Sequence, residues 1–386
     1  MKKRNICVVT GSRSEYGVLS GLLKELNCDH KVALDLIVTG EHLVGSKIQQ
    51  LERQLDSDNL VISKRVEMLL ATDSAVGINK SIGLGIIGIT DALVDLKPEL
   101  VVLSGDRFEM FAAAIAASGL SIPVAHLFGG EITEGALDEV YRHSITKMAH
   151  LHFVATERYQ KRVIQLGESP ERVFNFGSIS VDGISSALIL EKPVLEKDLS
   201  YSFGELNLLA TFHPETLGDS LPARQVEPLL AALDERPEIG IIFTYPNADS
   251  GREAIIQDIR NFVKSRNNAV FIENLGQERY FSCVHHCDGV IGNSSSGISE
   301  IPSFNKGTVN IGDRQGGRER AASVIDCVLE KGAILSAIDK LLSKSFQQKL
   351  KNAKNPYEKF GATKRVAWVL ANHCLENVLK KKFFDT

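Results

Sequence analysis

Short apolar runs rich in β-branched residues recur along this chain, and each is followed by a stretch with helical spacing. They occupy residues 6–11, 33–40, 100–105, 122–129, 151–157, 206–214, 239–246, 269–274, 289–297 and 308–312. Because the runs are continuously apolar rather than alternating, we expect strands that are buried on both faces. Strands that alternate with helices form parallel sheets covered by those helices. The sequence therefore predicts an α/β protein whose ligands bind beyond the carboxyl ends of its strands.

The length of the chain and one break in the pattern indicate two domains. The chain has 386 residues, more than a single core usually holds. Strand periodicity is lost near 185–205, so we expect a first domain over 1–185 and a second over 186–355. The last segment, 356–386, has an amphipathic helical pattern after Pro356. We expect this helix to pack back on the first domain.

Charge and cysteine content limit the partners and compartments to be considered. The net charge is −4 and the pI is near 6.2, so no basic field favours nucleic acid or an acidic membrane. The six cysteines are scattered, which favours reduced thiols in a cytosol. The N-terminal apolar run is too short for a signal peptide, and glycines and Asp91 interrupt the apolar stretch 81–96. We therefore expect a cytoplasmic protein that binds neither nucleic acid nor membrane.

Charged residues follow two strands of the first half. The first strand leads into Gly-Ser-Arg, where Arg13 either gives a forked donor to phosphate or lies solvated at an ordinary turn. This loop is neither a G-x-G-x-x-G motif nor a Walker A motif, so no nicotinamide or ATP site is indicated. Asp106 and Arg107 follow the strand at 100–105. Asp106 is either a helix N-cap or a site carboxylate whose pKa Arg107 can tune.

An acidic loop follows the strand at 122–129. Two glycines precede Glu131, and further carboxylates come at Glu134, Asp138 and Glu139. Such a loop is either a solvated acidic surface or the source of a general acid and a general base for one substrate. Both interpretations remain open from the residues alone.

In the second half, lone polar residues follow the strands. His213 and Asn247 each lie just beyond one, and Arg314 lies in a glycine-bearing turn after the last. His213 is either structural or a phosphate or acid–base group, and Arg314 either binds an anion or is solvated. The Cys-Val-His-His-Cys sequence at 283–287 lies in a helical pattern and matches no zinc-binding spacing. We therefore expect no metal.

The segment 289–300 ends an apolar strand with Asn, three serines and Gly, and a carboxylate follows at Glu300. Ser294, Ser295 and Ser296 are either caps of the next helix or part of a phosphate site. The second interpretation rests on the N–H groups and hydroxyls that a helix start exposes.

Several of these motifs together resemble one known family. The sequences GDRFE, GGEITEGALDE, RHSITKMAHLHF, FHPET, GNSSSG and NIGDRQ are similar to those of the hydrolysing UDP-N-acetylglucosamine 2-epimerases of bacterial sialic acid biosynthesis. The resemblance extends from Arg13 to about Asp326. It implies a GT-B-like fold, in which two Rossmann-like domains with parallel sheets face a central cleft that holds the nucleotide. It also implies release of UDP with inversion at C2 through a glycal, giving N-acetylmannosamine without a metal or a cofactor.

The resemblance implies a role for most of the candidate residues. Asp106, Glu131 and Asp138 correspond to the acidic set around the sugar. The residues that correspond to the UDP set are Arg13, His213, Ser294, Ser295, Glu300 and Arg314. We expect His213 to assist catalysis as well, by stabilising the leaving group. We also expect Arg107, Asn247 and Ser296 to complete the binding set.

One position departs from the family pattern. Relatives of the human type carry H-x-E-G-G-E, with a Glu that is thought catalytic, whereas this chain reads HLFGGE with Phe128 at that position. The acid–base work must then fall on Asp106, Glu131 or Asp138.

Two kinds of alternative remain open from the sequence. UDP-N,N′-diacetylbacillosamine, a precursor of legionaminic acid, is a second possible substrate, because Phe128 suits a small, more apolar pocket. A GT-B glycosyltransferase or a non-catalytic nucleotide-sugar sensor would use the same fold. The partners we expect are a UDP-sugar and further copies of the chain, in a homodimer or a homotetramer.

Overall fold

The computed structural model describes residues 3–72, 74–134, 136–184, 187–215, 224–246 and 251–386. The chain divides into two compact units. Unit 1 comprises Met1–Glu131, Asp138–Asp182 and Glu358–Thr386, and unit 2 comprises Ile132–Leu137 and Gly183–Tyr357. Each unit contains its own parallel sheet, so the expected α/β fold with two parallel-sheet domains is confirmed.

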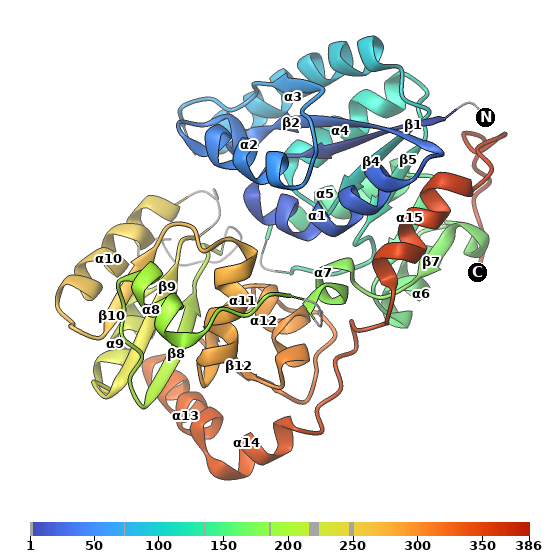
Figure 1. Ribbon diagram of the computed structural model, residues 1–386. Helices are drawn as coiled ribbons and strands as arrows, with labels where there is room; N and C mark the ends of the chain where they lie inside the picture. The colour runs from blue at the N-terminus through green and yellow to red at the C-terminus, as the bar shows by residue number, and fades with distance from the viewer. Residues whose placement is uncertain (1–2, 73, 135, 185–186, 216–223, 247–250) are drawn as a thin grey trace. The chain divides into compact units, whose positions relative to one another are not determined.

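Unit 1 is built on a seven-stranded sheet in the order β3-β2-β1-β4-β5-β6-β7 (Figure 1). Its strands are β1 (Arg4–Thr10), β2 (Val32–Thr39), β3 (Lys64–Val66), β4 (Leu100–Ser104), β5 (Val124–Leu127), β6 (Leu151–Val154) and β7 (Val173–Asn175). Its helices are α1 (Arg13–Cys28), η1 (Gly40–Leu43), α2 (Lys47–Ser57), α3 (Ala75–Leu96), α4 (Phe108–Gly119), α5 (Asp138–Met148), α6 (Glu157–Gln165), η2 (Pro170–Arg172), α7 (Ile179–Asp182) and α15 (Ala362–Asn372).

Helices cover both faces of this sheet, and β1 shows why its sequence is continuously apolar. Ile6 and Val8 pack into a core that includes residues of α1 and α15. Cys7 and Val9 point the other way, into a core formed with α3 and α4. Successive side chains of a strand point to opposite faces, so a strand between two helix layers needs apolar residues at every position.

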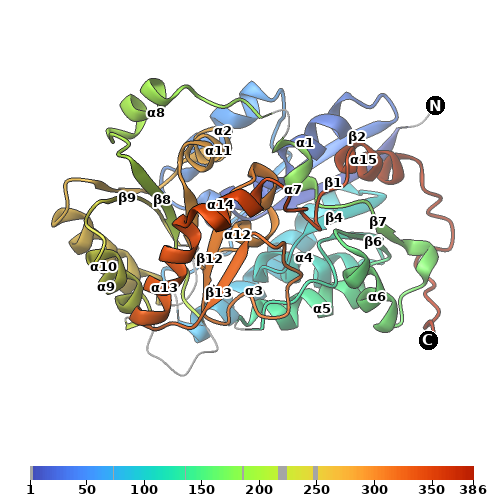
Figure 2. The same cartoon turned by 90° about the horizontal axis from the view of Figure 1, so that it is seen from below.

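Helix α15 packs on α1 within unit 1 (Figure 1, Figure 2). It is shorter than the pattern over 356–386 predicts. Gly361 precedes it in the left-handed conformation, with φ of 72°. At its other end, the Arg4 guanidinium donates to the carbonyl oxygens of Leu370 and His373, both at 2.7 Å. These bonds satisfy carbonyl groups that a helix end leaves without partners, and so help to fix the end of α15 there.

Unit 2 is built on a six-stranded sheet in the order β10-β9-β8-β11-β12-β13. Its strands are β8 (Leu206–Thr211), β9 (Ile239–Thr244), β10 (Ala269–Ile272), β11 (Gly289–Gly292), β12 (Gly307–Ile311) and β13 (Val324–Cys327). Its helices include α8 (Lys192–Leu199), α9 (Glu227–Asp234), α10 (Arg252–Lys264), α11 (Gly276–His286), α12 (Ser296–Ser299), η5 (Ile301–Phe304), α13 (Lys331–Leu342) and α14 (Lys344–Leu350). Leu208 and Leu209 of β8 face separate cores, as in unit 1.

Three strands were not expected from the sequence. β3, β7 and β13 each lie at an edge of their sheet. They are three or four residues long and are only partly buried. An edge strand of this kind needs no continuous apolar run, so it leaves little signal in the sequence.

Helix α3 differs from the expectation that no segment resembles a membrane span. It has 22 residues and a mean hydropathy of 1.2, which suffices for a span by length and composition alone. Along the chain it follows β3 and precedes β4, two strands of the same sheet. Ile89 and Leu93 on one of its faces pack into the core that α4 shares. Its apolar character therefore serves a helix layer of unit 1.

Candidate functional site

Both sheets have a topological switch point, and loops bearing candidate residues flank it. In unit 1 the chain builds outward from β1 to β3 and then resumes on the other side of β1 with β4. The loops after β1 and β4 carry Arg13 and Asp106. In unit 2 the corresponding pair is β8 and β11, followed by His213 and Ser294. Ligands of open α/β sheets bind at such points.

The loop after β1 leads into the N-terminus of α1, where some backbone N–H groups already donate to an acceptor of the protein. Ser12 caps α1 in a capping box with Glu15. The Glu15 carboxylate accepts from the N–H groups of Gly11 at 2.6 Å and Ser12 at 3.1 Å. Burial and the neighbouring Glu109 carboxylate raise the pKa of Glu15 to about 8. The Arg13 side chain, which donates to Gln50 at 3.0 Å, is therefore the group of this loop best suited to an anion.

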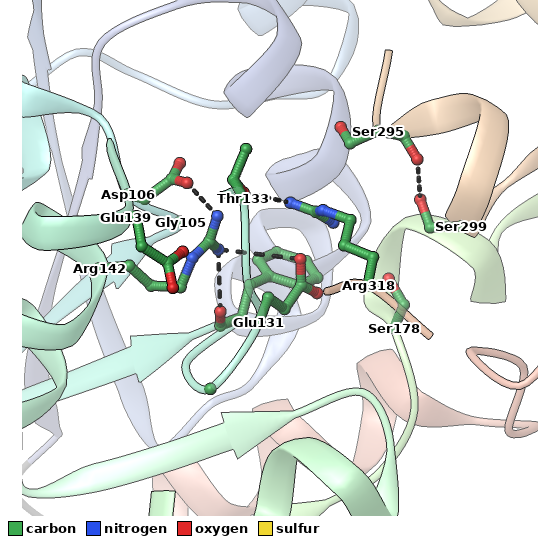
Figure 3. Close-up of polar contacts among 12 residues, drawn as sticks. Gly105, Asp106, Glu131, Thr133, Glu139, Arg142, Ser178, Ser295, Ser299 and Arg318 are labelled. Carbon is green, nitrogen blue, oxygen red and sulfur yellow. Dashed lines mark hydrogen bonds and ion pairs between the residues drawn. The ribbon is translucent and has the colours of Figure 1, made fainter. Parts of the chain in front are cut away.

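Asp106 does not cap the helix that follows it. The N-cap position of α4 is Arg107, and its side chain makes no capping bond. The Asp106 carboxylate instead accepts from the Arg142 guanidinium (Figure 3). The capping interpretation of Asp106 is therefore wrong. Arg107 points its Nε toward Glu109, 3.7 Å from the carboxylate oxygen.

Arg142 joins the acidic residues of unit 1. It lies on α5 and is 2% exposed, yet it carries a guanidinium that requires acceptors. It binds Asp106, lies 3.8 Å from an oxygen of Glu131, and donates to the carbonyl oxygen of Phe128 at 3.2 Å (Figure 3). Sequence reasoning missed this residue, because an Arg inside a helical pattern looks like a solvated side chain.

The loop that carries Glu131 is fixed by its unusual backbone. Phe128 has φ of 65°, in the left-handed region that a bulky residue rarely adopts. Gly130 has φ of 75°, and a Cβ there would lie 2.5 Å from the Tyr159 carbonyl oxygen. His126 donates its Nε2–H to the carbonyl oxygen of Gly105 at 2.7 Å, and burial lowers its pKa to about 3. The Phe128 side chain packs against the core that contains α1 and α15.

The acidic loop is divided between the two units. Glu131 and Asp138 belong to unit 1, whereas the residues between them belong to unit 2. Within unit 2, Arg318 donates to the hydroxyl of Thr133 at 3.3 Å (Figure 3). Asp138 is the first residue of α5, one helical turn before Arg142, so Asp138 and Arg142 lie on one face of that helix.

Asn293 is the centre of the polar set in unit 2, and the sequence did not single it out. Its side chain accepts from the His213 N–H at 2.7 Å and donates to the His213 carbonyl oxygen at 2.8 Å. Its own carbonyl oxygen accepts from Arg314 at 3.3 Å. Gly292 precedes it with φ of 138°, and a Cβ there would lie 1.8 Å from the Thr211 carbonyl oxygen. The loops after β8, β11 and β12 are thereby held together.

The three serines do not act as helix caps. Helix α12 has only four residues, and its N-cap, Ser295, makes no side-chain capping bond. The Ser296 hydroxyl donates to Glu300 at 2.7 Å and also contacts the Tyr280 hydroxyl. Because the helix is one turn long, its dipole adds little. Hydroxyls and first-turn amides are the groups available to an anion here.

One further group completes this region of unit 2. The Glu215 carboxylate accepts from the Arg314 N–H at 3.3 Å, and burial raises its pKa. Asn247 lies outside the described residues. The signal for Glu215 in the sequence is Phe-His-Pro-Glu-Thr, in which Glu215 follows His213 by two residues.

The Cys-Val-His-His-Cys sequence lies at the end of helix α11, and its two cysteines belong to the protein core. All six cysteines of the chain are free. Cys283 and Cys287 pack with Leu195 and Val290. Burial raises the pKa of Cys283 to about 12 and that of Cys287 well above its ordinary value.

Fold and site together define an α/β protein of two doubly wound units, each with charged and polar loops at its switch point. The chain matches the family described as UDP-N-acetylglucosamine 2-epimerase over residues 24–371. It is 40% identical over 390 residues to the GDP/UDP-N,N′-diacetylbacillosamine 2-epimerase (hydrolyzing) of Campylobacter jejuni, covering 100% of both chains. The chain belongs to the UDP-N-acetylglucosamine 2-epimerase family.

The chain is also similar to a second curated relative and, in its fold, to a solved structure. The chain is 40% identical over 369 residues to the polysialic acid biosynthesis protein P7 of Escherichia coli, covering 94% of this chain and 92% of that protein. Its fold is similar to that of the UDP-GlcNAc 2-epimerase from Neisseria meningitidis, solved bound to UDP-GlcNAc. The TM-score is 0.81 at 20% identity, over 95% of this chain and 99% of the other.

Proposed function

We propose that this protein is a hydrolysing 2-epimerase that converts UDP-N-acetylglucosamine and water to UDP and N-acetylmannosamine. The observation that carries the proposal is the buried Arg142, which binds Asp106 and lies beside Glu131 in a member of this family. A guanidinium between two carboxylates holds charged oxygens in fixed positions, as acid–base chemistry at one carbon requires.

In this proposal the acidic set of unit 1 removes the proton at C2 and delivers a new one. One carboxylate removes the C2 proton while the C1–O bond breaks and its electron pair leaves with UDP, giving a glycal. Water then adds across the glycal: its oxygen bonds to C1 and one of its protons is released to solvent, while a second acid delivers a proton to C2 from the opposite face. Glu131 and Asp138 are the proposed acid and base, since the ion pair with Arg142 engages Asp106 as an orienting anion.

The polar set of unit 2 holds UDP in the same proposal. The leaving diphosphate carries the charge that develops as the C1–O bond breaks, so donors aimed at it lower the barrier. Ser294, Ser295, His213 and Arg314 supply such donors around Asn293. Glu300 is proposed to accept from the ribose hydroxyls, with Ser296 orienting it. Arg13, Arg107 and Asn247 are proposed to complete the binding set.

A second substrate is favoured by two comparisons. The Campylobacter jejuni relative, 40% identical over the whole chain, is named for GDP/UDP-N,N′-diacetylbacillosamine. A Legionella pneumophila relative, 35% identical over 345 residues, is named for UDP-N,N′-diacetylbacillosamine. That sugar has the same UDP group, C2 acetamido group and C2 proton, so the chemistry proposed above applies to it unchanged. The proposals for the two substrates differ only in what contacts C4 and C6. The six free cysteines support a reducing compartment such as the cytoplasm for either.

The test is incubation of the purified protein with each UDP-sugar alone, with UDP quantified by chromatography. Release of UDP from either sugar without an acceptor supports the hydrolysing activity, and the higher kcat/KM identifies the substrate. UDP release that requires an added acceptor would indicate a glycosyltransferase instead. Tight binding of UDP without any turnover would indicate a sensor.

A further inference from the structure

A short segment of unit 2 lies, along the chain, between two stretches of unit 1. Unit 1 breaks off after Glu131 and resumes at Asp138, whereas Ile132–Leu137 belongs to unit 2. The proposed acid and base are therefore the two residues that flank this segment. Each is joined to it by a peptide bond, so the position of the segment limits where both carboxylates can lie. Whatever holds the segment in unit 2 thus helps to position the proposed acid–base pair.

The segment is held by the turn of residues 313–318, which follows β12. The Arg318 guanidinium donates to the hydroxyl of Thr133 at 3.3 Å (Figure 3). Thr133 is 4% exposed and Arg318 is 8% exposed, so little water competes for this hydrogen bond. Gly317 has φ of 76°, and a Cβ there would lie 2.5 Å from Cγ2 of Ile132. The glycine therefore allows the turn and the segment to pack closely.

The same 313–318 turn is bonded to the proposed UDP set. Arg314 donates to the carbonyl oxygen of Asn293 at 3.3 Å, and the buried Gln315 side chain donates to the same oxygen at 2.9 Å. Asn293 directly precedes the first of the three serines. A diphosphate bound by Arg314 and the serines would therefore restrain this turn, and the turn in turn restrains the segment that Arg318 contacts.

We propose that Arg318 and Thr133 are positioning residues, which couple the binding of UDP in unit 2 to the alignment of the proposed acid and base. UDP held by Arg314 and the serines fixes the 313–318 turn. Arg318 passes this constraint to Thr133, and the segment then sets the positions of the two carboxylates that flank it. The inference rests on the proposed function, from which it takes the acid, the base and the UDP site.

Removal of the Thr133 hydroxyl tests the contact through a split between kcat and affinity. Thr133→Val keeps the size of the side chain and removes the acceptor, so kcat for UDP release should fall at least about tenfold, because slight misplacement of reacting groups lowers a rate strongly. The affinity for UDP, measured by calorimetry, should stay within about twofold, since the proposed UDP donors are unchanged. Thr133→Ser keeps the hydroxyl and should recover most of kcat.

Thr39→Val is the matched control for loss of a buried threonine hydroxyl. Thr39 is fully buried in unit 1, and its hydroxyl donates to the carbonyl oxygen of Val66 at 2.6 Å. This variant should keep the kcat and the UDP affinity of the wild type. An unchanged kcat in Thr133→Val overturns the proposal. So does a Thr133→Ser variant that is as slow as Thr133→Val, because the hydrogen bond would then not be what positions the segment.

Hydrogen exchange tests the coupling without any turnover. UDP alone is added to saturation, and mass spectrometry follows the exchange of backbone amides. In the wild type, UDP should slow exchange in peptides that cover 132–137 as well as in those that cover 293–300. In Thr133→Val, the protection of 293–300 should remain and that of 132–137 should be lost.

The outcomes separate this inference from the proposed function. Protection of 293–300 alone in a wild-type protein that releases UDP from its substrate overturns the coupling and leaves the proposed function standing. Protection of both segments in a protein that releases no UDP from either sugar contradicts the proposed function and supports the coupling. A wild-type protein that does not bind UDP overturns both.

Discussion

Arg142 illustrates what single residues contribute to this site and what the sequence reveals of them. Asp106 and Glu131 were predictable, because charged residues directly after a buried strand lie where α/β sheets bind ligands. Arg142 was not, because its burial depends on the path of α5 beside two loops that are distant in sequence. Asn293 was overlooked for the same reason, since its partners His213 and Arg314 come from other strands.

Asp106→Asn should keep the fold and the affinity for UDP while lowering UDP release about 100-fold, the scale on which a misplaced orienting group lowers the rate. An Asn fits the site but cannot form the ion pair with Arg142. Turnover is measured by UDP release, UDP affinity by calorimetry, and folding by a thermal melt. Turnover within a few fold of the wild type would show that the charge of Asp106 is dispensable.

Glu131→Gln and Asp138→Asn should each lower turnover at least about 100-fold, because an amide can neither remove nor deliver the C2 proton. UDP affinity should stay unchanged in both, since the proposed UDP donors lie on other loops. Glu134→Gln is a control on the same loop, because Glu134 is exposed. If both variants turn over like this control, the acid–base assignment fails.

Joint replacement of Ser294 and Ser295 by Ala should weaken UDP binding at least about tenfold, because hydrogen bonds to charged groups contribute about 1.5–3 kcal/mol each. The melting temperature should stay near that of the wild type, because Ser295, the N-cap, makes no side-chain capping bond. Calorimetric titration with UDP and a thermal melt of the same preparation separate the two effects. A lower melting temperature with unaltered UDP affinity would return the serines to a capping role.

At the scale of elements, the apolar strands were predictable, including the edge strand β10, whereas three short edge strands were not. The continuously apolar runs correspond to β1, β2, β4 and other strands covered on both faces. β3, β7 and β13 were not predicted, because these short edge strands are only partly buried and carry no continuous apolar run. The C-terminal helix was predicted too long, since hydrophobic periodicity continues where Arg4 binds the last carbonyl oxygens of α15.

A buried carboxylate ties the C-terminal segment to the end of α5. Glu168 is 2% exposed and accepts from Lys147 at 2.6 Å, His152 at 3.0 Å and Lys381 at 2.7 Å. Burial would raise its pKa, but these hydrogen bonds dominate and lower it to about 2 from an ordinary value of 4.5. A depressed carboxyl pKa stabilises the fold above the ordinary value, and this stability is lost as pH falls toward 2.

Glu168→Gln should therefore lower the free energy of unfolding at pH 7 by on the order of 3 kcal/mol. The deficit should shrink as the pH is lowered from about 4.5 toward 2, because the carboxyl of Glu168 takes up a proton in the unfolded wild type while the native carboxylate stays ionised. Urea unfolding of both proteins at pH 7, 5 and 3.5 measures the difference. A deficit that is the same at all three pH values would show that the ionisation of Glu168 does not stabilise the fold.

At the scale of the whole molecule, the sequence predicted two parallel-sheet units but not the order of their strands. That order determines the switch points, between β1 and β4 and between β8 and β11. It emerges only from which strands pair across long stretches of sequence. The switch points in turn explain why the candidate residues gather into an acidic set in unit 1 and a polar, cationic set in unit 2. The two sets match the two halves of the proposed chemistry, proton transfer at C2 and departure of UDP.

The central claim is hydrolysis coupled to inversion at C2. The configuration and the deuterium content of C2 in the product test it most directly. The protein is incubated in D₂O with UDP-N-acetylglucosamine, and in parallel with UDP-N,N′-diacetylbacillosamine, while proton NMR follows the sugar. We expect free UDP and a free sugar of inverted C2 configuration, with one deuterium at C2, because the original proton is removed and a solvent deuteron replaces it. A product that keeps its C2 proton, keeps its C2 configuration, or remains attached to UDP would contradict the account.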